Sequence, residues 1–142
     1  MCSPGASCQN VTASQALALE VKPVARIVVS GAPPPLVVSA GGGIASATDV
    51  TSTYSLVTNL RSMRIVASID SPMPSGTSLA ITLQSANGVS RGEVEITGSA
   101  EVVAGIAPGS ETDQRITYRF SALPGVTELA TGERTVTLTL TD

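Results

Sequence analysis

The stretch QALALEVKPVARIVVSG, residues 15–31, alternates like a β-strand but is too long to be one ordinary strand. Apolar side chains keep the odd positions from Leu17 to Val29, and the phase is kept across Pro23. Counted from Val11, some twenty extended residues would reach about 65 Å, whereas strands usually span about 17–20 Å. The segment therefore predicts two strand-forming halves that meet at Pro23.

Strand-like alternation recurs through the rest of the chain, interrupted by turn signals. We expect strands at residues 36–38, 53–58, 63–69, 79–83, 93–97, 101–106, 115–120 and 135–141. We expect a flexible loop at 40–47, a turn at 71–76, an Asn-Gly type I′ turn at 86–88, a polar turn at 109–114 and at most one helical turn at 127–131. No segment sustains the helical i, i+3, i+4 period.

This pattern predicts an all-β fold, a single immunoglobulin-like antiparallel β-sandwich with a long N-terminal strand segment. We divide the chain into residues 1–23, an N-terminal extension and candidate donor strand, and residues 24–142, the sandwich domain. The alternation predicts which side chains point into the core: Leu79, Ile81, Leu83, Ile116, Tyr118, Phe120, Val136, Leu138 and Leu140.

The amino-acid composition argues against several classes of function. Charged residues make up 13% of the 142 residues, against roughly 25% in ordinary soluble domains. The net charge is −3 and the eight basic residues are scattered, which argues against nucleic-acid binding. No apolar run approaches the roughly 20 residues of a membrane span. We therefore expect no nucleic-acid partner and no membrane span, and the Thr- and Ser-rich surface favours a secreted protein.

The two cysteines, Cys2 and Cys8, enclose Pro4 and Gly5, a spacing that allows a small disulfide loop. The alternative is a pair of free thiols in an N-terminal tail. A disulfide implies an oxidising compartment, so we expect an extracellular or cell-surface location. Asn10 begins an Asn-Val-Thr triplet, a possible glycosylation acceptor.

The residues of common catalytic sites are missing or dispersed. The chain has no histidine, which removes the usual base of serine and cysteine nucleophiles. Glu93 and Glu95 share one outward strand face, so we interpret them as solvated rather than as a glycosidase pair. The polar run 109–114 lacks the acidic spacing of a calcium loop. Tyr118 and Phe120 alternate inward as core residues. We expect no enzyme activity, no cofactor and no metal.

Two interpretations of the opening stretch remain. In a split first strand, residues 11–21 pair with one sheet, the chain kinks at Pro23, and residues 24–30 pair with the other sheet. In strand donation, residues 24–30 belong to the chain's own sandwich, Pro23 is a hinge, and residues 11–21 insert into another copy. The contacts to that copy would be made by Val11, Ala13, Leu17, Leu19 and Val21.

Three segments resemble bacterial secreted sandwich proteins: TYSLVTN at 53–59, RIVASIDSPMPSGTSLAITL at 64–83 and RTVTLTLTD at 134–142. In these segments the chain is similar to pilin-like fibre subunits and envelope adhesins, and the motifs are structural. With the overlong N-terminal segment, this favours a structural subunit of an extracellular filament or pilus, a head-to-tail homopolymer formed by strand donation. The alternative is a monomeric or anchored envelope module that binds a glycan or protein through loops 40–47 and 71–76.

Overall fold

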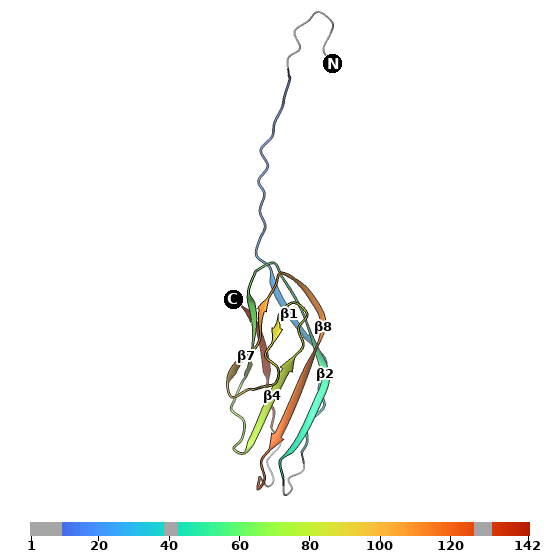
Figure 1. Ribbon diagram of the computed structural model, residues 1–142, viewed down its shortest axis with the longest axis vertical. Coiled ribbons are helices and arrows are strands. Elements are labelled where there is room, and N and C mark those ends of the chain that lie inside the picture. Colours follow the sequence, from blue (N-terminus) through green and yellow to red (C-terminus); the bar gives the residue numbers. More distant parts are fainter. Residues whose placement is uncertain (1–9, 39–42, 127–131) are drawn as a thin grey trace, which may run out of the picture.

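The computed structural model describes residues 10–38, 43–126 and 132–142, and it is an all-β sandwich of two antiparallel sheets (Figure 1). Its strands are β1 (Ala25–Ser30), β2 (Ala45–Thr58), β3 (Met63–Ile69), β4 (Thr77–Leu83), β5 (Val89–Ser90), β6 (Val94–Glu95), β7 (Ser99–Ile106), β8 (Gly109–Ala122) and β9 (Val136–Thr141). The described residues contain no helix that is long and apolar enough to cross a membrane. The predicted all-β class, with an antiparallel β-sandwich, is confirmed.

The two sheets have different strand orders. One sheet has the order β1-β2-β8-β4-β6 and the other has β5-β7-β3-β9. β2 and β8 are the longest strands, with 14 residues each, and their pairing forms the spine of the five-stranded sheet. Two register shifts, between Asp49 and Ser52 and between Tyr54 and Leu56, bend this pair as β-bulges do.

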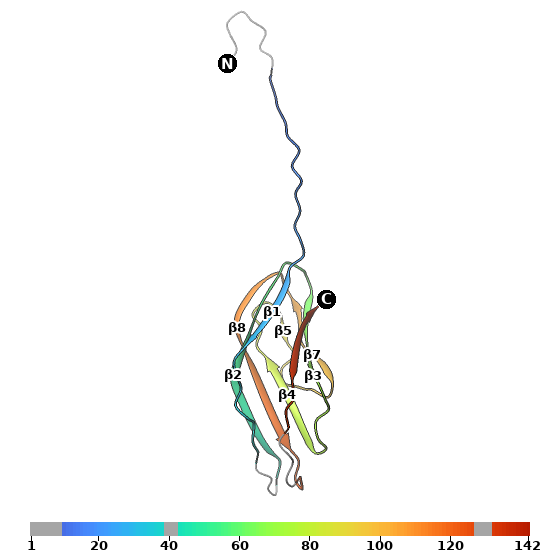
Figure 2. The same cartoon turned by 180° about the vertical axis from the view of Figure 1, so that it is seen from behind.

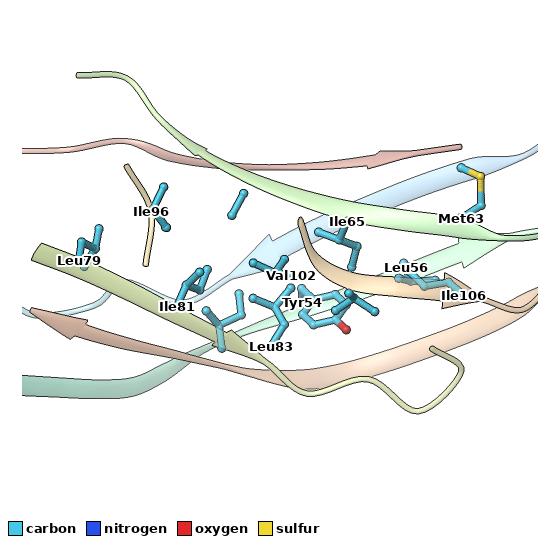
Figure 3. Packing of buried hydrophobic residues seen from close by; sticks show 13 residues of the cluster. Tyr54, Leu56, Met63, Ile65, Leu79, Ile81, Leu83, Ile96, Val102 and Ile106 are labelled. Carbon is cyan, nitrogen blue, oxygen red and sulfur yellow. The ribbon is translucent and has the colours of Figure 1, made fainter. Parts of the chain in front are cut away.

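The core lies between the sheets, where the inward face of each strand meets that of the other layer (Figure 3). The fully buried large side chains come from five strands and the residue after β6: Tyr54, Ile65, Ile81, Leu83, Ile96, Val102, Val103, Ile106 and Ile116. Branched aliphatic residues dominate because each fits a pleated surface with few rotamers to lose.

The predicted inward face is confirmed, although its depth differs along the chain. Leu79, Ile81, Leu83 and Ile116 are buried. The other five residues, Tyr118, Phe120, Val136, Leu138 and Leu140, pack against the core but are partly exposed. All three predicted inward residues of β9 belong to this second group, so this strand is covered incompletely.

Several local predictions were wrong. Residues 36–38 form no strand, because no other strand pairs with them in the described chain. The expected loop 40–47 is shortened, since β2 begins at Ala45 and pairs there with Ala122. The polar run 109–114 is not a turn but the first part of β8. The single helical turn expected at 127–131 lies outside the described residues.

The Asn87–Gly88 signal does not form a two-residue hairpin. β4 and β5 belong to different sheets, so the segment between them is a crossover from one layer to the other. A side chain at Gly88 would approach Cγ1 of Ile106 to 2.8 Å, so glycine is required here by close packing.

Residues 10–24 lie outside both sheets and extend from one end of the body along its long axis (Figures 1 and 2). β1 begins at Ala25 and pairs with β2, from Ala25 opposite Thr58 to Ser30 opposite Thr53. The split-strand prediction is therefore wrong for this chain on its own, because residues 11–21 pair with neither sheet.

Candidate functional site

The extension presents an apolar row to solvent. Leu19 is 88% exposed, and the other large apolar side chains of the row, Val11, Leu17 and Val21, are exposed as well. They share one face of the extended segment with Ala13 and Gln15, and the opposite face carries only polar or small residues, so the first face is the more apolar one. Leaving such side chains in water forgoes about 1.5–3 kcal/mol for each large one. An exposed apolar row of this kind marks an interaction surface.

The remaining predicted site residues lie at the two ends of the extension. Ala13 is exposed beside Val11, and Asn10 is exposed at the first described position. Pro23 is exposed at the root, where the extension joins β1. Cys2 and Cys8 lie outside the described residues, so their disulfide stays a prediction.

A second unusual feature is the side of the sandwich where the edge strands β1 and β9 lie close together, which we call the open flank. Directly opposed residues of an antiparallel pair share one face, and Val29 on β1 opposes Tyr54 on β2. Tyr54 is fully buried, whereas Val29 is 49% exposed. Val29 therefore faces the interior side of the sheet but has little to cover it.

The β9 side of the open flank is similar. Leu138 opposes Ala67 and Leu140 opposes Ile65, and both β3 partners are fully buried. The two leucines share this inner face, yet each is partly exposed. Both edge strands thus carry inward-facing apolar side chains that the chain itself covers incompletely.

The opposite side, bounded by β6 and β5, is the closed flank. Ile96 follows β6 directly, is 1% exposed, and donates its backbone N–H to the carbonyl of Leu79 at 2.8 Å. Val103, the β7 partner of β5, is fully buried. Arg91, just after β5, donates its N–H to the carbonyl of Val102 at 2.9 Å. Here Ile96 and Val103 are buried, while Val94 of β6, which opposes the fully buried Ile81, is half-buried.

The root of the extension is held by a residue that the sequence did not single out. Asn59, the first residue after β2, accepts the Val24 N–H on Oδ1 at 2.8 Å. Its Nδ2 donates to the Lys22 carbonyl at 2.9 Å, and its backbone N–H donates to the Val24 carbonyl at 3.1 Å. The signal available in the sequence was an asparagine at a strand end, which is too common to predict a partner 37 residues away.

Glu111 is a buried carboxylate near the same end of the body. Its Oε1 accepts from Ser85 Oγ at 2.8 Å, from the Asn87 N–H at 2.7 Å and from the Ala86 N–H, while Oε2 is buried without a hydrogen-bond partner. It opposes Leu56 on β2 and so points inward. Burial, with the charge of Glu111, raises the pKa of Tyr54 to about 12. The hydrogen bonds from Ser85, Ala86 and Asn87 to Glu111 hold the β4–β5 crossover against β8.

Some of the other charged groups form ion pairs on the surface. Arg91 and Arg64 approach Glu101 at 2.8 and 3.6 Å, and Arg119 pairs with Glu93. Glu93 and Glu95 are both exposed, in keeping with the interpretation of a solvated face. Within residues 10–38, 43–126 and 132–142 there is no group of three His, Cys, Asp or Glu side chains placed to hold a metal ion.

The two features suited to recognition are therefore the exposed extension and the open flank. One is a strand without a sheet, and the other is a pair of sheet edges with uncovered apolar side chains. No family model, curated protein or solved structure matches this chain.

Proposed function

We propose that this chain is a structural subunit of an extracellular filament or pilus, and that residues 11–21 of each copy fill the open flank of the next. One observation carries the proposal: a single chain has both an unpaired strand with an apolar face and a flank with uncovered apolar side chains. Adding an extended segment to a sheet edge is an established mode of peptide recognition.

Strand order supports β9 as the acceptor edge. In a constant-type immunoglobulin domain one sheet has the order A-B-E-D and the other C-F-G. The order β1-β2-β8-β4 resembles A-B-E-D, and the neighbouring strands β3 and β9 resemble C and F, with β6 added beyond β4 and β7 added beyond β3. Among the described strands, none pairs with the outer edge of β9, the position that G takes beside F in that domain. A donated strand would take that place.

Strand direction supports an open filament over a closed dimer. Asn59 bonds Val24, β3 begins shortly after it, and Arg64 of β3 opposes Thr141, so β9 ends near the root of the extension. A strand antiparallel to β9 therefore runs from the extension end of the acceptor to the opposite end, and its own body follows beyond that end. Each extension then points forward into the next copy, a head-to-tail contact that does not close.

The energy of this joint is substantial. Covering Leu17, Leu19 and Val21 is worth about 1.5–3 kcal/mol each, and each new backbone hydrogen bond adds about 0.5–1.5 kcal/mol net. The acceptor also covers its own Val29, Leu138 and Leu140. Ordering the extension costs conformational entropy, but the segment is already extended and holds Pro23 at its root.

The decisive experiment compares two charges placed on adjacent residues of the extension. Leu19→Asp puts a carboxylate on the apolar face, and Ala18→Asp puts the same charge on the other face. We expect the wild-type chain and Ala18→Asp to form filaments by negative-stain microscopy and sedimentation, and Leu19→Asp to remain a folded monomer. A wild-type chain that stays monomeric would favour a single envelope module. Filaments from Leu19→Asp would exclude this donor face.

The extracellular location is part of the same proposal. It rests on the low charge content and on the expected Cys2–Cys8 disulfide. Mass spectrometry of the secreted protein under non-reducing conditions should show one linked pair. Two alkylatable thiols in that material would contradict it.

A further inference from the structure

The root of the extension is a second point of interest, distinct from the donor face itself. In a filament built by strand donation, residues 11–21 would be fixed in the neighbour and residues from Ala25 onward in the subunit's own sheet. The link between two bodies is then Lys22, Pro23 and Val24. The freedom of these three residues decides how far one body can swing against the next.

Asn59 is hydrogen-bonded to both sides of this link. Its side-chain amide accepts from the Val24 N–H at 2.8 Å and donates to the Lys22 carbonyl at 2.9 Å, bridging Pro23. Pro23 has no N–H and cannot donate a ladder hydrogen bond. The Val24–Asn59 pair also continues the β1–β2 ladder one step beyond Ala25 and Thr58, through the bond from the Asn59 N–H to the Val24 carbonyl.

The base of this contact is itself anchored. Thr58 is 2% exposed, and its Oγ1 accepts the N–H of Leu60 at 3.0 Å. Leu60 packs against the core. Asn59 therefore sits between two residues that are fixed in the body, so its side chain can transmit the orientation of the body to the link.

We infer that Asn59 is a positioning residue that clamps the root of the donor segment and stiffens the joint between successive subunits. The inference rests on the proposed function. A primary amide suits this role because it offers an acceptor and a donor in fixed geometry. Aspartate keeps the acceptor for the Val24 N–H and loses the donor for the Lys22 carbonyl, whereas alanine loses both.

The test uses full-length Asn59→Ala and Asn59→Asp, with Asn87→Ala as the matched control. Asn87 lies at the same end of the body and bonds the Ser110 carbonyl through Nδ2 at 3.1 Å. Asn87→Ala thus removes a comparable bond without touching the link. Amide hydrogen exchange of Val24 is measured in the monomer carrying Leu19→Asp, and persistence length is measured on filaments of the chains with Leu19 intact.

We expect the Val24 amide to exchange about tenfold faster in Asn59→Ala, since the protecting side chain is gone, and to stay protected in Asn59→Asp and Asn87→Ala. Filaments of Asn59→Ala and Asn59→Asp should have shorter persistence lengths than wild type, and those of Asn87→Ala should match wild type. Fast Val24 exchange in the chain with native Asn59 would overturn the clamp. So would equal persistence lengths in all four chains, or equal softening by Asn87→Ala.

Failure of the proposed function gives a different result. If the chain with native Asn59 and Leu19 forms no filaments at all, strand donation is refuted. The proposed stiffening of the joint by Asn59 is then refuted as well. If filaments form and their persistence length does not depend on residue 59, only the role of Asn59 is refuted and strand donation is retained.

Discussion

The closed and open flanks of this sandwich are built from the same kinds of residue, but they differ in how well their inward-facing apolar side chains are covered. At the closed flank Ile96 is 1% exposed and bonded to β4, whereas at the open flank Val29 is 49% exposed although its neighbour Tyr54 is fully buried. Each flank is bounded by one edge strand from each sheet, β6 and β5 at the closed flank and β1 and β9 at the open flank. The difference shows that alternation alone does not guarantee burial, because an inward side chain also needs a strand or layer beyond it.

The largest expected effect comes from closing the open flank within one chain. β9 ends near the root of the extension, so residues 11–21 moved from the N-terminus to follow Asp142 through a short turn can run back antiparallel along β9. Covering three large apolar side chains should add on the order of 5 kcal/mol. For a domain of this size that corresponds to about 10–20 °C in Tm.

Differential scanning calorimetry measures this shift, with the truncated chain lacking residues 1–21 as the reference. The control carries aspartate in place of Leu17 and Leu19 in the moved segment. If both rearranged chains melt at the temperature of the truncated chain, the open flank is not an acceptor for this segment.

A pair of leucine truncations compares the interior with the open flank directly. Leu83→Ala removes a fully buried side chain of β4 and should cost about 2–5 kcal/mol of unfolding free energy. Leu138→Ala on β9 should cost less in the Leu19→Asp monomer, because Leu138 is already partly exposed, and should approach the Leu83 value once the flank is filled. Urea unfolding measures the loss of unfolding free energy for Leu83→Ala and for Leu138→Ala. Equal costs in the monomer would mean that β9 is as well covered as β4.

Tyr54 reports whether water enters the interior between the two sheets. Burial raises its pKa from the ordinary 10.0 to about 12, so the neutral phenol is favoured in the folded state. The corresponding stability is fully present below pH 10 and is lost as pH rises from 10 to 12, about 2–3 kcal/mol in all.

Tyrosinate absorbance in a Tyr118→Phe background follows Tyr54 alone, because the chain has two tyrosines. Circular dichroism on the same samples shows whether the fold persists. A midpoint near pH 10 in a chain that is still folded would show that solvent reaches the Tyr54 hydroxyl.

The smallest effects concern Glu111, which fastens the β4–β5 crossover between the two sheets. Glu111→Ala removes the acceptor for Ser85 Oγ and for the N–H groups of Ala86 and Asn87, and should cost about 1–3 kcal/mol. Glu111→Gln keeps an acceptor and removes the charge of a carboxylate whose Oε2 is unpaired, so its cost should be smaller. Thermal unfolding at neutral pH compares the Tm values of Glu111→Ala and Glu111→Gln with that of the wild-type chain. The reverse order would mean that the charge matters more than the bonds.

Local patterns predicted much of the fold, and non-local pairing accounts for most of the errors. Met63–Ile69 was expected as a strand and forms β3 with the same ends. Residues 36–38 have a strand-like composition but no partner, and residues 45–49 have little strand pattern yet pair with β8. Glu111 was expected in a solvated turn, and its burial depends on three donors that lie 24 to 26 residues away.

The candidate site divides in the same way. The apolar row Val11, Leu17, Leu19 and Val21 was visible in the sequence, because a period of two needs no knowledge of partners. That row could not show whether it folds back on its own sheet, nor which edge of the sandwich is uncovered. The Asn59 contacts with Lys22 and Val24 were also invisible, since they join residues that meet through the β1–β2 ladder.

The sequence by itself determined the all-β class, the inward faces of the strands and the presence of an overlong N-terminal segment, because side-chain alternation is a local property of extended chain. The tertiary structure alone decided that this segment leaves the body, that β1 and β9 are the uncovered edges, and that Asn59 holds the root. Those outcomes depend on which strands pair and in what order, and hydrogen bonds between distant backbones set that order.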